Sequence, residues 1–234
     1  MAELLYEGKA KQVYKTDKED EYLMHYKDDA TAGNGVKHDK FEGKGVLNNT
    51  ISCIIFDMLE EAGIKTHMIK KLNERDILVK KVDIFPLEVI VRNITTGSFC
   101  KRLGAPEGIV LDEPIFEMSY KNDEYGDPLI NDDHAVALKL ATREELAYIK
   151  ETTLKINELL KEFFLSMNLK LVDFKIEFGK TADGTILLAD EISPDSCRLW
   201  DVDTNQKYDK DVFRQDIGDL IETYKAVLAR MQNK

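Results

Sequence analysis

The chain has 234 residues, of which 43% are hydrophobic and 33% are charged, and its formal net charge is −11. This length and composition predict a folded globular protein with one large or two small domains, and they exclude a disordered chain. The negative charge argues against nucleic acid and anionic membranes as partners, because both need a basic protein surface; a local basic pocket for a small anion stays compatible with it.

The three cysteines (Cys53, Cys100 and Cys197) are odd in number, widely spaced and without a CxxC pair. This pattern predicts free, buried or half-buried thiols and neither a disulfide framework nor a metal site. The N-terminal sequence has no apolar signal core, and no stretch approaches 18 uncharged apolar residues. We therefore expect a cytoplasmic protein.

The N-terminal third is expected to contain several short strands and one helix. Apolar residues recur at helical spacing from about Phe41 to Ala62, and Gly63 is a natural stop for this helix. Pro86 separates two strand-like runs, which predicts a boundary near this point between an N-terminal lobe, residues 1–85, and a C-terminal lobe, residues 86–234. The strands expected here are 4–14, interrupted by a turn at Gly8, and then 21–26, 77–82 and 87–92.

The C-terminal part is expected to begin irregularly, because residues 104–135 are rich in Pro, Gly, Asp and Asn. A capping-box sequence, Thr142 to Glu145, then opens a long amphipathic helix, and a last amphipathic helix is expected over 211–231. Between these helices lie two strands, 171–178 and 186–192. Strands that cluster between helices favour an α+β fold over a regular βαβ array.

The first of these two strands places its charged side chains on one face. Because side chains alternate along a strand, Asp173, Lys175 and Glu177 share a face at intervals of about 6.6 Å. The neighbouring strand ends in Asp190 and Glu191. Glu177 and Asp190 could supply the one or two carboxylates that Mg²⁺ takes beside phosphate oxygens and water. A solvated outer face is the alternative, since the sequence does not fix the register of the hairpin.

The segment Gly8-Lys9-Ala10-Lys11 lies between two expected strands. A turn of small residues lets backbone N–H groups approach phosphate oxygens, and two lysines add positive charge. An ordinary hairpin turn with exposed lysines is the alternative, and the GxxxxGK[ST] phosphate loop is absent from the chain.

A second anion site is expected where a strand ends at Arg92. A Thr/Gly/Ser turn leads from there through Ser98 into a short helical run that ends at Gly104. Unpartnered N–H groups at such a turn bind anions, and arginine adds a bidentate fork for phosphate or carboxylate. The alternative is a capped turn with a surface arginine. Arg198 brings a second arginine close to Asp190 in the sequence.

Two long segments resemble the signatures of the SAICAR synthetase family, the phosphoribosylaminoimidazole-succinocarboxamide synthases of purine biosynthesis. They are IFPLEVIVR at 84–92, continued through Ser98, and LVDFKIEFG at 171–179. Shorter landmarks follow in the family's order, namely GKAK at 8–11, KRLG at 101–104, SPDS at 193–196 and RLWD at 198–201. The resemblance, which runs from about residue 4 to 230, implies a two-lobed nucleotide-binding fold with antiparallel sheets flanked by helices.

The resemblance implies an ATP-dependent carbon–nitrogen ligase that uses Mg²⁺. The family joins L-aspartate to the carboxylate of carboxyaminoimidazole ribonucleotide (CAIR), and ATP is cleaved to ADP and phosphate. A carboxylate is a poor electrophile, so we expect activation as an acyl phosphate, which requires positioning and charge neutralisation more than a protein nucleophile. The expected partners are these small molecules and further copies of the chain in a homo-oligomer; no nucleic acid, membrane or second activity is expected.

The same resemblance implies roles for individual residues. Around ATP and Mg²⁺ they are Lys9, Ala10, Lys11, Val13, Val82, Ile84 and Lys121, with Glu177 and Asp190 holding the metal and the strand around 82–84 acting as a hinge. Around the ribonucleotide they are Arg92, Ser98, Asp173, Lys175, Asp195 and Arg198. Lys11, Asp173 and Lys175 are the expected catalytic residues.

The aspartate site is not indicated by any motif. The loops at 33–38 and 131–135 are candidates to close over the substrates, because glycine and polar residues permit such motion.

Two rival functions remain open at this point. A small-molecule kinase of related two-lobed fold is the first; a protein kinase is excluded, because the chain lacks an HRD-type catalytic loop and a DFG context. The second is a nucleotide-sensing module without turnover. Such a module predicts gaps among the polar residues of the site, yet these are all present, namely Lys11, Arg92, Glu177, Asp190 and Arg198.

Overall fold

Two antiparallel sheets frame the molecule in the computed structural model, which describes residues 3–32 and 36–233. The first sheet has the strand order β1-β2-β3-β7-β6. Its strands are β1 (Leu4–Glu7), β2 (Lys11–Lys15), β3 (Glu21–Tyr26), β6 (Met68–Lys71) and β7 (Asp76–Lys80). A separate two-stranded ribbon consists of β4 (Asp29–Ala32) and β5 (Lys37–Lys40).

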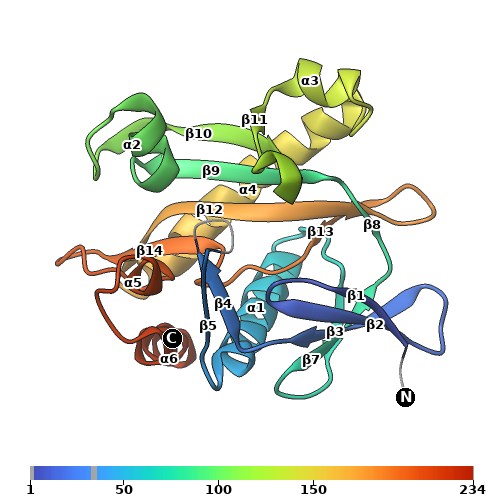
Figure 1. Ribbon diagram of the computed structural model, residues 1–234, viewed down its shortest axis with the longest axis horizontal. Coiled ribbons are helices and arrows are strands. Elements are labelled where there is room, and N and C mark those ends of the chain that lie inside the picture. Colours follow the sequence, from blue (N-terminus) through green and yellow to red (C-terminus); the bar gives the residue numbers. More distant parts are fainter. Residues whose placement is uncertain (1–2, 33–35, 234) are drawn as a thin grey trace.

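The second sheet has the order β11-β10-β9-β12-β13, and both β14 and β8 also pair with the long strand β12. Its strands are β8 (Asp83–Ile84), β9 (Leu87–Ile94), β10 (Val110–Tyr120), β11 (Leu129–Ile130), β12 (Leu169–Lys180), β13 (Ile186–Ala189) and β14 (Cys197–Asp201). In Figure 1 this sheet lies beside the first one, and β8 lies on the connection between them. The predicted α+β class with antiparallel sheets is confirmed.

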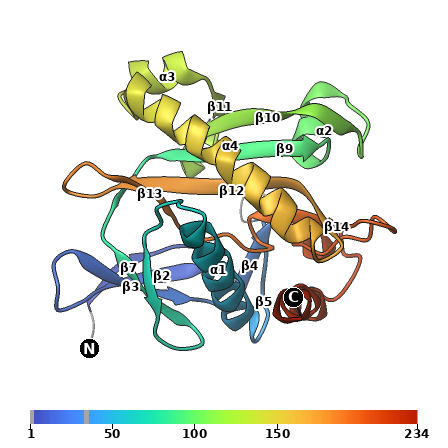
Figure 2. The ribbon, with the colours of Figure 1, turned by 180° about the vertical axis from the view of Figure 1, so that it is seen from behind.

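Helices cover the sheets from one side (Figure 2). Helix α1 (Lys44–Glu61) packs on β3 and β6, and α4 (Arg143–Leu165) runs across β12 and β9. Their buried apolar side chains, such as Ile51 and Phe56 of α1 and Ile156 of α4, belong to one continuous core with both sheets. The remaining helices are α2 (Gly97–Leu103), the 3-10 turn η1 (Asp123–Tyr125), α3 (Asp132–Ala137), α5 (Asp211–Arg214) and α6 (Leu220–Gln232).

The predicted start of α4 and the predicted end of α1 are confirmed. The Thr142 side chain accepts a hydrogen bond from the backbone N–H of Glu145, whose carboxylate accepts one from Thr142 N–H at 2.8 Å. Gly63, after α1, has φ 84°, a left-handed conformation that glycine adopts without a Cβ clash.

The expectation of mainly loops over 104–135 is wrong for residues 110–120, which form β10. The register of β10 against β9 shifts between Val110 and Ile115, and Pro114 lies in that shift, where no ladder N–H is needed. Four of its eleven residues are exposed, and its apolar residues do not alternate over a length that would reveal the strand.

A single helix over 211–231 is also wrong, because α5 ends at Arg214 and α6 begins at Leu220. Asp216 takes a left-handed conformation at φ 54°, and the Asp219 side chain caps α6 by accepting from Glu222 N–H. The cap satisfies an N–H that a continuous helix would have bonded internally. Strand β14, which has five residues, was not predicted from the sequence.

The chain leaves the first sheet at Lys80 and joins the second at Asp83, close to the expected boundary. The division into lobes 1–85 and 86–234 stays a prediction, since α1 and α6, one from each, pack against each other. None of the described helices is long and apolar enough to cross a membrane. All three cysteines are free thiols; Cys53 and Cys197 are buried and Cys100 is partly buried, as predicted.

Candidate active site

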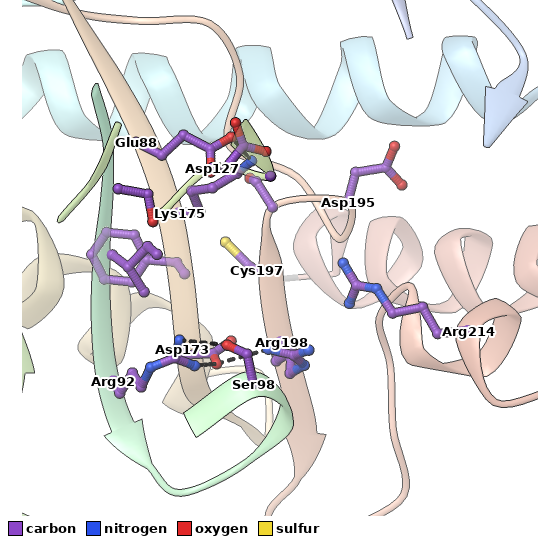
Figure 3. A pocket seen from close by; sticks show the side chains of 15 residues that line it. Glu88, Arg92, Ser98, Asp127, Asp173, Lys175, Asp195, Cys197, Arg198 and Arg214 are labelled. Carbon is purple, nitrogen blue, oxygen red and sulfur yellow. Dashed lines mark hydrogen bonds and ion pairs between the residues drawn. The ribbon is translucent and has the colours of Figure 1, made fainter. Parts of the chain in front are cut away.

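Strands β9 and β12 form the floor of a polar pocket of about 370 Å³ (Figure 3). Their register pairs Arg92 with Asp173 and Ile90 with Lys175. Because side chains on paired strands alternate in step, these residues and Glu88 rise from the same face of the sheet. The alternating residues Phe174 and Ile176 are 1% exposed in the core.

One end of the pocket holds two arginines around a shared carboxylate. Arg92 donates from Nη1 to Asp173 at 3.0 Å and from Nη2 to Ser98 Oγ at 3.1 Å, while Arg198 Nη1 donates to the same Asp173 oxygen at 2.9 Å. Glu117 and Asp211 hold the Nε atoms of Arg92 and Arg198 at 2.8 and 3.0 Å. Asp173 is 4% exposed, so the alternative of a solvated outer face is wrong for this residue. The two guanidinium groups are thus fixed by buried carboxylates and oriented for an anion.

Neighbouring carboxylates keep the Arg198 side chain in its charged form. Burial opposes the charge, but Asp173 and Asp211 outweigh it and raise the pKa of the guanidinium. Gly97, at the start of α2, lets the chain pass close by: its φ is 57°, and a Cβ there would lie 2.6 Å from Arg198 Nη2. The sequence places Gly97 where only a residue without a side chain fits.

The other end of the pocket carries an ion pair of Lys175 with Glu88, and Asp127 lies beside it (Figure 3). The Lys175 side chain is 42% exposed and the Glu88 side chain is 13% exposed. The pocket therefore runs from a cationic end at Arg92 and Arg198 to a mixed end where an ammonium and carboxylates stand together.

Asp195 lies on a third side of the pocket and is held by buried partners. Lys44 Nζ and the Tyr224 hydroxyl each donate to it at 2.5 Å, and Lys210 Nζ lies 3.7 Å away. Burial alone would raise the pKa of Asp195, but Lys44 and Lys210 lower it well below the usual value. Asp195 is thus an anion at neutral pH that links the pocket to α1 and α6.

A second polar cluster lies where β12 meets β13. The register pairs Glu177 with Ala189, which brings Asp190 next to Glu177. Lys11 Nζ donates to Asp190 at 2.5 Å and to Glu191 at 3.0 Å, and Lys121 Nζ donates to both Glu177 oxygens, the shorter contact being 2.6 Å. Residues from β2, the end of β10, β12 and β13 therefore converge at one place.

The pKa values of this cluster reflect burial and mutual charge. Burial, followed by the charge of Asp190, raises the pKa of Glu177. Burial also opposes the charge of Asp190, but Lys11 overcomes it and lowers the pKa. Burial likewise opposes the charge of Lys11, whose pKa is nevertheless raised by Asp190 and Glu191.

Two neighbouring carboxylates suit Mg²⁺, which takes only one or two ligands from the protein, better than they suit a metal ion whose ligands all come from the protein. The mutual repulsion of Glu177 and Asp190 is what a divalent cation would relieve. No group of three or more His, Cys, Asp or Glu side chains able to hold a metal occurs within residues 3–32 and 36–233. Two adjacent carboxylates, Glu177 and Asp190, fit an ion that completes its shell with phosphate oxygens and water.

The remaining residues expected around the nucleotide make contacts of other kinds. Lys9, on the turn before β2, pairs with Asp123 at 2.8 Å; Ala10 accepts from Lys27 N–H at 2.8 Å; and Val13 packs on the core. Val82 and Ile84 cover Gly179, where a Cβ would lie 2.4 Å from Val82 Cγ2. Of the expected residues, Lys11 and Lys121 thus contact Asp190 and Glu177, and Arg92, Ser98, Asp173, Lys175, Asp195 and Arg198 line the pocket.

The structure adds residues that the sequence did not indicate. Glu88 pairs with Lys175, and Glu117 pairs with Arg92. Lys44 is fully buried against Asp195, and Glu191 shares Lys11 with Asp190. Glu88 could have been found, because it lies four residues before Arg92 on an alternating strand. Lys44 gave no signal, since a lysine at the start of a helix is usually exposed.

The two candidate lids have different outcomes. Residues 33–35 of the first lie outside the described residues. Asn131, in the second, caps α3 and shares a capping box with His134. Closure of either segment over substrates stays a prediction.

A polar pocket with fixed arginines beside a lysine-bound carboxylate pair, on an α+β frame, defines a class of protein built to hold phosphorylated small molecules. The SAICAR synthetase family matches residues 4–231 of the chain. The phosphoribosylaminoimidazole-succinocarboxamide synthase of Finegoldia magna is 67% identical across 98% of this chain and 99% of that protein, and the enzyme of Caldanaerobacter subterraneus is 61% identical across 98% and 97%.

Solved structures agree with these relatives. A SAICAR synthetase (Type-2) in complex with ADP superimposes with a TM-score of 0.95 at 52% identity, covering 98% of this chain and 97% of that one. The phosphoribosylaminoimidazole-succinocarboxamide synthase from Ehrlichia chaffeensis gives a TM-score of 0.96 at 45% identity and 98% coverage of both chains. The chain belongs to the SAICAR synthetase family, and the resemblance stated from its motifs is confirmed.

Proposed function

We propose that the chain is an ATP-dependent ligase that joins L-aspartate to the carboxylate of CAIR and releases SAICAR, ADP and phosphate. Relatives that bear the name of this enzyme match the chain along nearly its full length. The observation that carries the proposal is the shared face of β9 and β12, with arginines at one end and Lys175 at the other. Such a pocket is complementary to a molecule with a phosphate at one end and a carboxylate at the other.

The ribonucleotide is assigned to the pocket. Arg92, Ser98 and Arg198 receive its phosphate, because they form the cationic end and are already oriented by buried carboxylates. Lys175 neutralises the carboxylate that reacts, and Asp173 positions the two arginines. Asp195, which lines the remaining side of the pocket, is proposed to border the ribose or ring while Lys44 and Tyr224 hold it.

The nucleotide is assigned to the neighbouring cluster. Lys9, Ala10 and Lys11 form the turn that faces the phosphates, with Lys11 as the buried cation closest to the carboxylates. Val13, Val82, Ile84 and Lys121 border the nucleotide. Glu177 and Asp190 would hold Mg²⁺, which when bound supplies charge neutralisation for the phosphates and the substrate carboxylate.

The chain contributes orientation and charge, and no nucleophile is needed. Glu177 and Lys175 lie two residues apart on the same face of β12, so the two groups of residues adjoin along one strand. Lys11 and Lys175 stabilise the charge that passes from the γ-phosphate to the carboxylate oxygen. The amine of aspartate then attacks the activated carbon. A small-molecule kinase is not favoured, because the relatives that match the chain along nearly its full length bear the name of the ligase.

The proposal is tested by product analysis. Protein is incubated with ATP, Mg²⁺, CAIR and L-aspartate, and ADP and SAICAR are separated and quantified; each substrate is omitted in turn. Equal amounts of ADP and SAICAR are expected only in the complete mixture. ADP release that is indifferent to CAIR would contradict the ligase, and phosphorylation of a hydroxyl compound without SAICAR would favour the kinase.

We infer a cytoplasmic homo-oligomer that binds these small molecules and neither nucleic acid nor membrane. Light scattering of the purified protein measures its mass, and a monomer of 26.8 kDa at all concentrations would contradict the oligomer.

A further inference from the structure

We propose that Glu88 recognises the 5-amino group of the ribonucleotide and so determines which imidazole carboxylate the enzyme accepts. This inference rests on the proposed function and adds a specificity-determining residue to it.

Glu88 lies at the end of the pocket where the imidazole ring must be. It precedes Arg92 by four residues on β9, so both side chains point to the same face, about 13 Å apart along the strand. This separation leaves room for a ribose between a phosphate at Arg92 and a ring at Glu88. Figure 3 shows Glu88 next to Lys175 and away from Arg92, Ser98 and Arg198.

The Glu88–Lys175 pair matches two neighbouring groups of the proposed substrate. The imidazole ring carries a carboxylate and an amine on adjacent carbons. The ring draws in the lone pair of the amine, so the amine is a hydrogen-bond donor while the carboxylate is an acceptor. Glu88 offers an acceptor and Lys175 a donor, in direct contact with each other at the pocket. Adjacent opposite charges on the protein thus face adjacent donor and acceptor groups on the ring.

Of the other carboxylates that line the pocket, Asp173 and Asp195 contact protein cations, and Asp127 accepts from Asn122 N–H at 2.8 Å. Asp173 and Glu117 orient Arg92, and Asp195 is held by Lys44 and Tyr224. Among the described residues, Glu88 forms an ion pair with one lysine, the half-exposed Lys175. Glu88 also joins no metal-binding group of three in the described residues. An amine that donates a hydrogen bond is therefore a suitable ligand for Glu88. A ribonucleotide without this amine would lose the hydrogen bond to Glu88, and this loss would weaken its binding relative to CAIR.

The test compares CAIR with the analogue that lacks the 5-amino group, in wild type, Glu88→Ala and a matched control, Glu113→Ala, which removes an exposed carboxylate from β10. Ribonucleotide binding is measured by calorimetry, and turnover of either ribonucleotide is measured by aspartate-dependent ADP release. Wild type and Glu113→Ala should prefer CAIR by about tenfold or more, as expected for a hydrogen bond to a charged group. In Glu88→Ala the preference should fall towards one, mainly through loss of CAIR binding.

Glu88→Gln is a second variant in which the same preference is measured, in case the alanine variant folds poorly. Its amide oxygen can accept from the amine but cannot pair ionically with Lys175, so an intermediate preference is expected. An undiminished preference in both variants would overturn the proposal. So would an effect confined to the Mg²⁺ requirement or to the KM for aspartate, because Glu88 would then serve the metal or the other substrate. If wild type turns over neither ribonucleotide, the proposed ligase itself fails, which is a separate and recognisable result.

Discussion

At the scale of single residues, Asp190 combines a charge requirement with a backbone requirement. Its φ of 60° is left-handed, a region that costs most L-residues about 1–2 kcal/mol and that Asp and Asn tolerate best. The same residue is the partner of Lys11 and the neighbour of Glu177. Asparagine can therefore remove the charge while keeping the backbone, which alanine cannot do.

Asp190→Asn is expected to lower turnover by at least about a hundredfold, because under the proposed function Asp190 is a ligand of Mg²⁺. Lys11 keeps Glu191 as a partner, so the free energy of unfolding should fall by only about 2 kcal/mol. Asp190→Ala should cost about 1 kcal/mol more, through its left-handed backbone. Urea unfolding and steady-state assays measure both effects; near-normal turnover in the asparagine variant would remove Asp190 from the metal site.

Gly97→Ala should weaken binding of the ribonucleotide, because its methyl group would lie 2.6 Å from Arg198 and displace the guanidinium. The KM for CAIR is expected to rise about tenfold or more. Gly104→Ala is the control: Gly104 has a similar φ of 67°, yet a Cβ there meets nothing within 4 Å. If both variants raise this KM equally, backbone strain and not Arg198 would be the cause.

At the scale of elements, patterns that are local in sequence were predictable and patterns that depend on partners were not. The capping box of α4, the end of α1 and the faces of β12 follow from neighbouring residues. Strand β10 owes its conformation to pairing with β9 across a register shift, and the α5–α6 break depends on Asp219. Neither feature produces a periodic signal in its own sequence.

The site residues also divide into those that could be predicted from local sequence and those that depend on contacts across the fold. Alternation along β12 placed Asp173 and Lys175, and the strand end placed Arg92 near Ser98. Contacts made across the fold, such as Lys121 with Glu177 and Lys44 with Asp195, join residues 56 and 151 positions apart. Both contacts are properties of the assembled fold. Family resemblance indicated Lys121 only as a residue bordering the nucleotide, and Lys44 was found from the structure alone.

Thr142→Ala should destabilise the fold without affecting catalysis. Loss of the cap costs about 1 kcal/mol, which lowers the midpoint of thermal unfolding by about 2–4 °C for a chain of this size. Thr142→Ser retains the hydroxyl and should lie close to wild type. A fall in turnover of folded Thr142→Ala would show that α4 influences the pocket more directly than its packing suggests.

At the scale of the whole molecule, buried ionisable groups set how stability responds to pH. Burial, followed by the charge of Asp211, raises the pKa of Asp209 to about 7. In the unfolded chain this carboxyl has an ordinary pKa near 4. Between these values the folded state binds more protons than the unfolded one, so this group stabilises the fold below about pH 4 and loses that contribution as pH rises to about 7.

Asp209→Asn should flatten the decline of unfolding free energy between about pH 4.5 and 7. The variant should also be less stable overall, because Asp209 accepts hydrogen bonds from the N–H groups of both Leu199 and Asp211, and an amide has one acceptor atom. Urea titrations at a series of pH values measure the slope. An unchanged slope in the variant would mean that Asp209 does not titrate in this range.

The central claim is that the two adjoining groups of residues direct the γ-phosphate of ATP onto the substrate carboxylate. CAIR labelled with ¹⁸O in that carboxylate tests it most directly, with the released phosphate analysed by mass spectrometry. One ¹⁸O atom per phosphate is expected, because the carboxylate oxygen leaves with the phosphoryl group. Phosphate without the label, formed alongside SAICAR, would contradict the account and show that water receives the phosphoryl group.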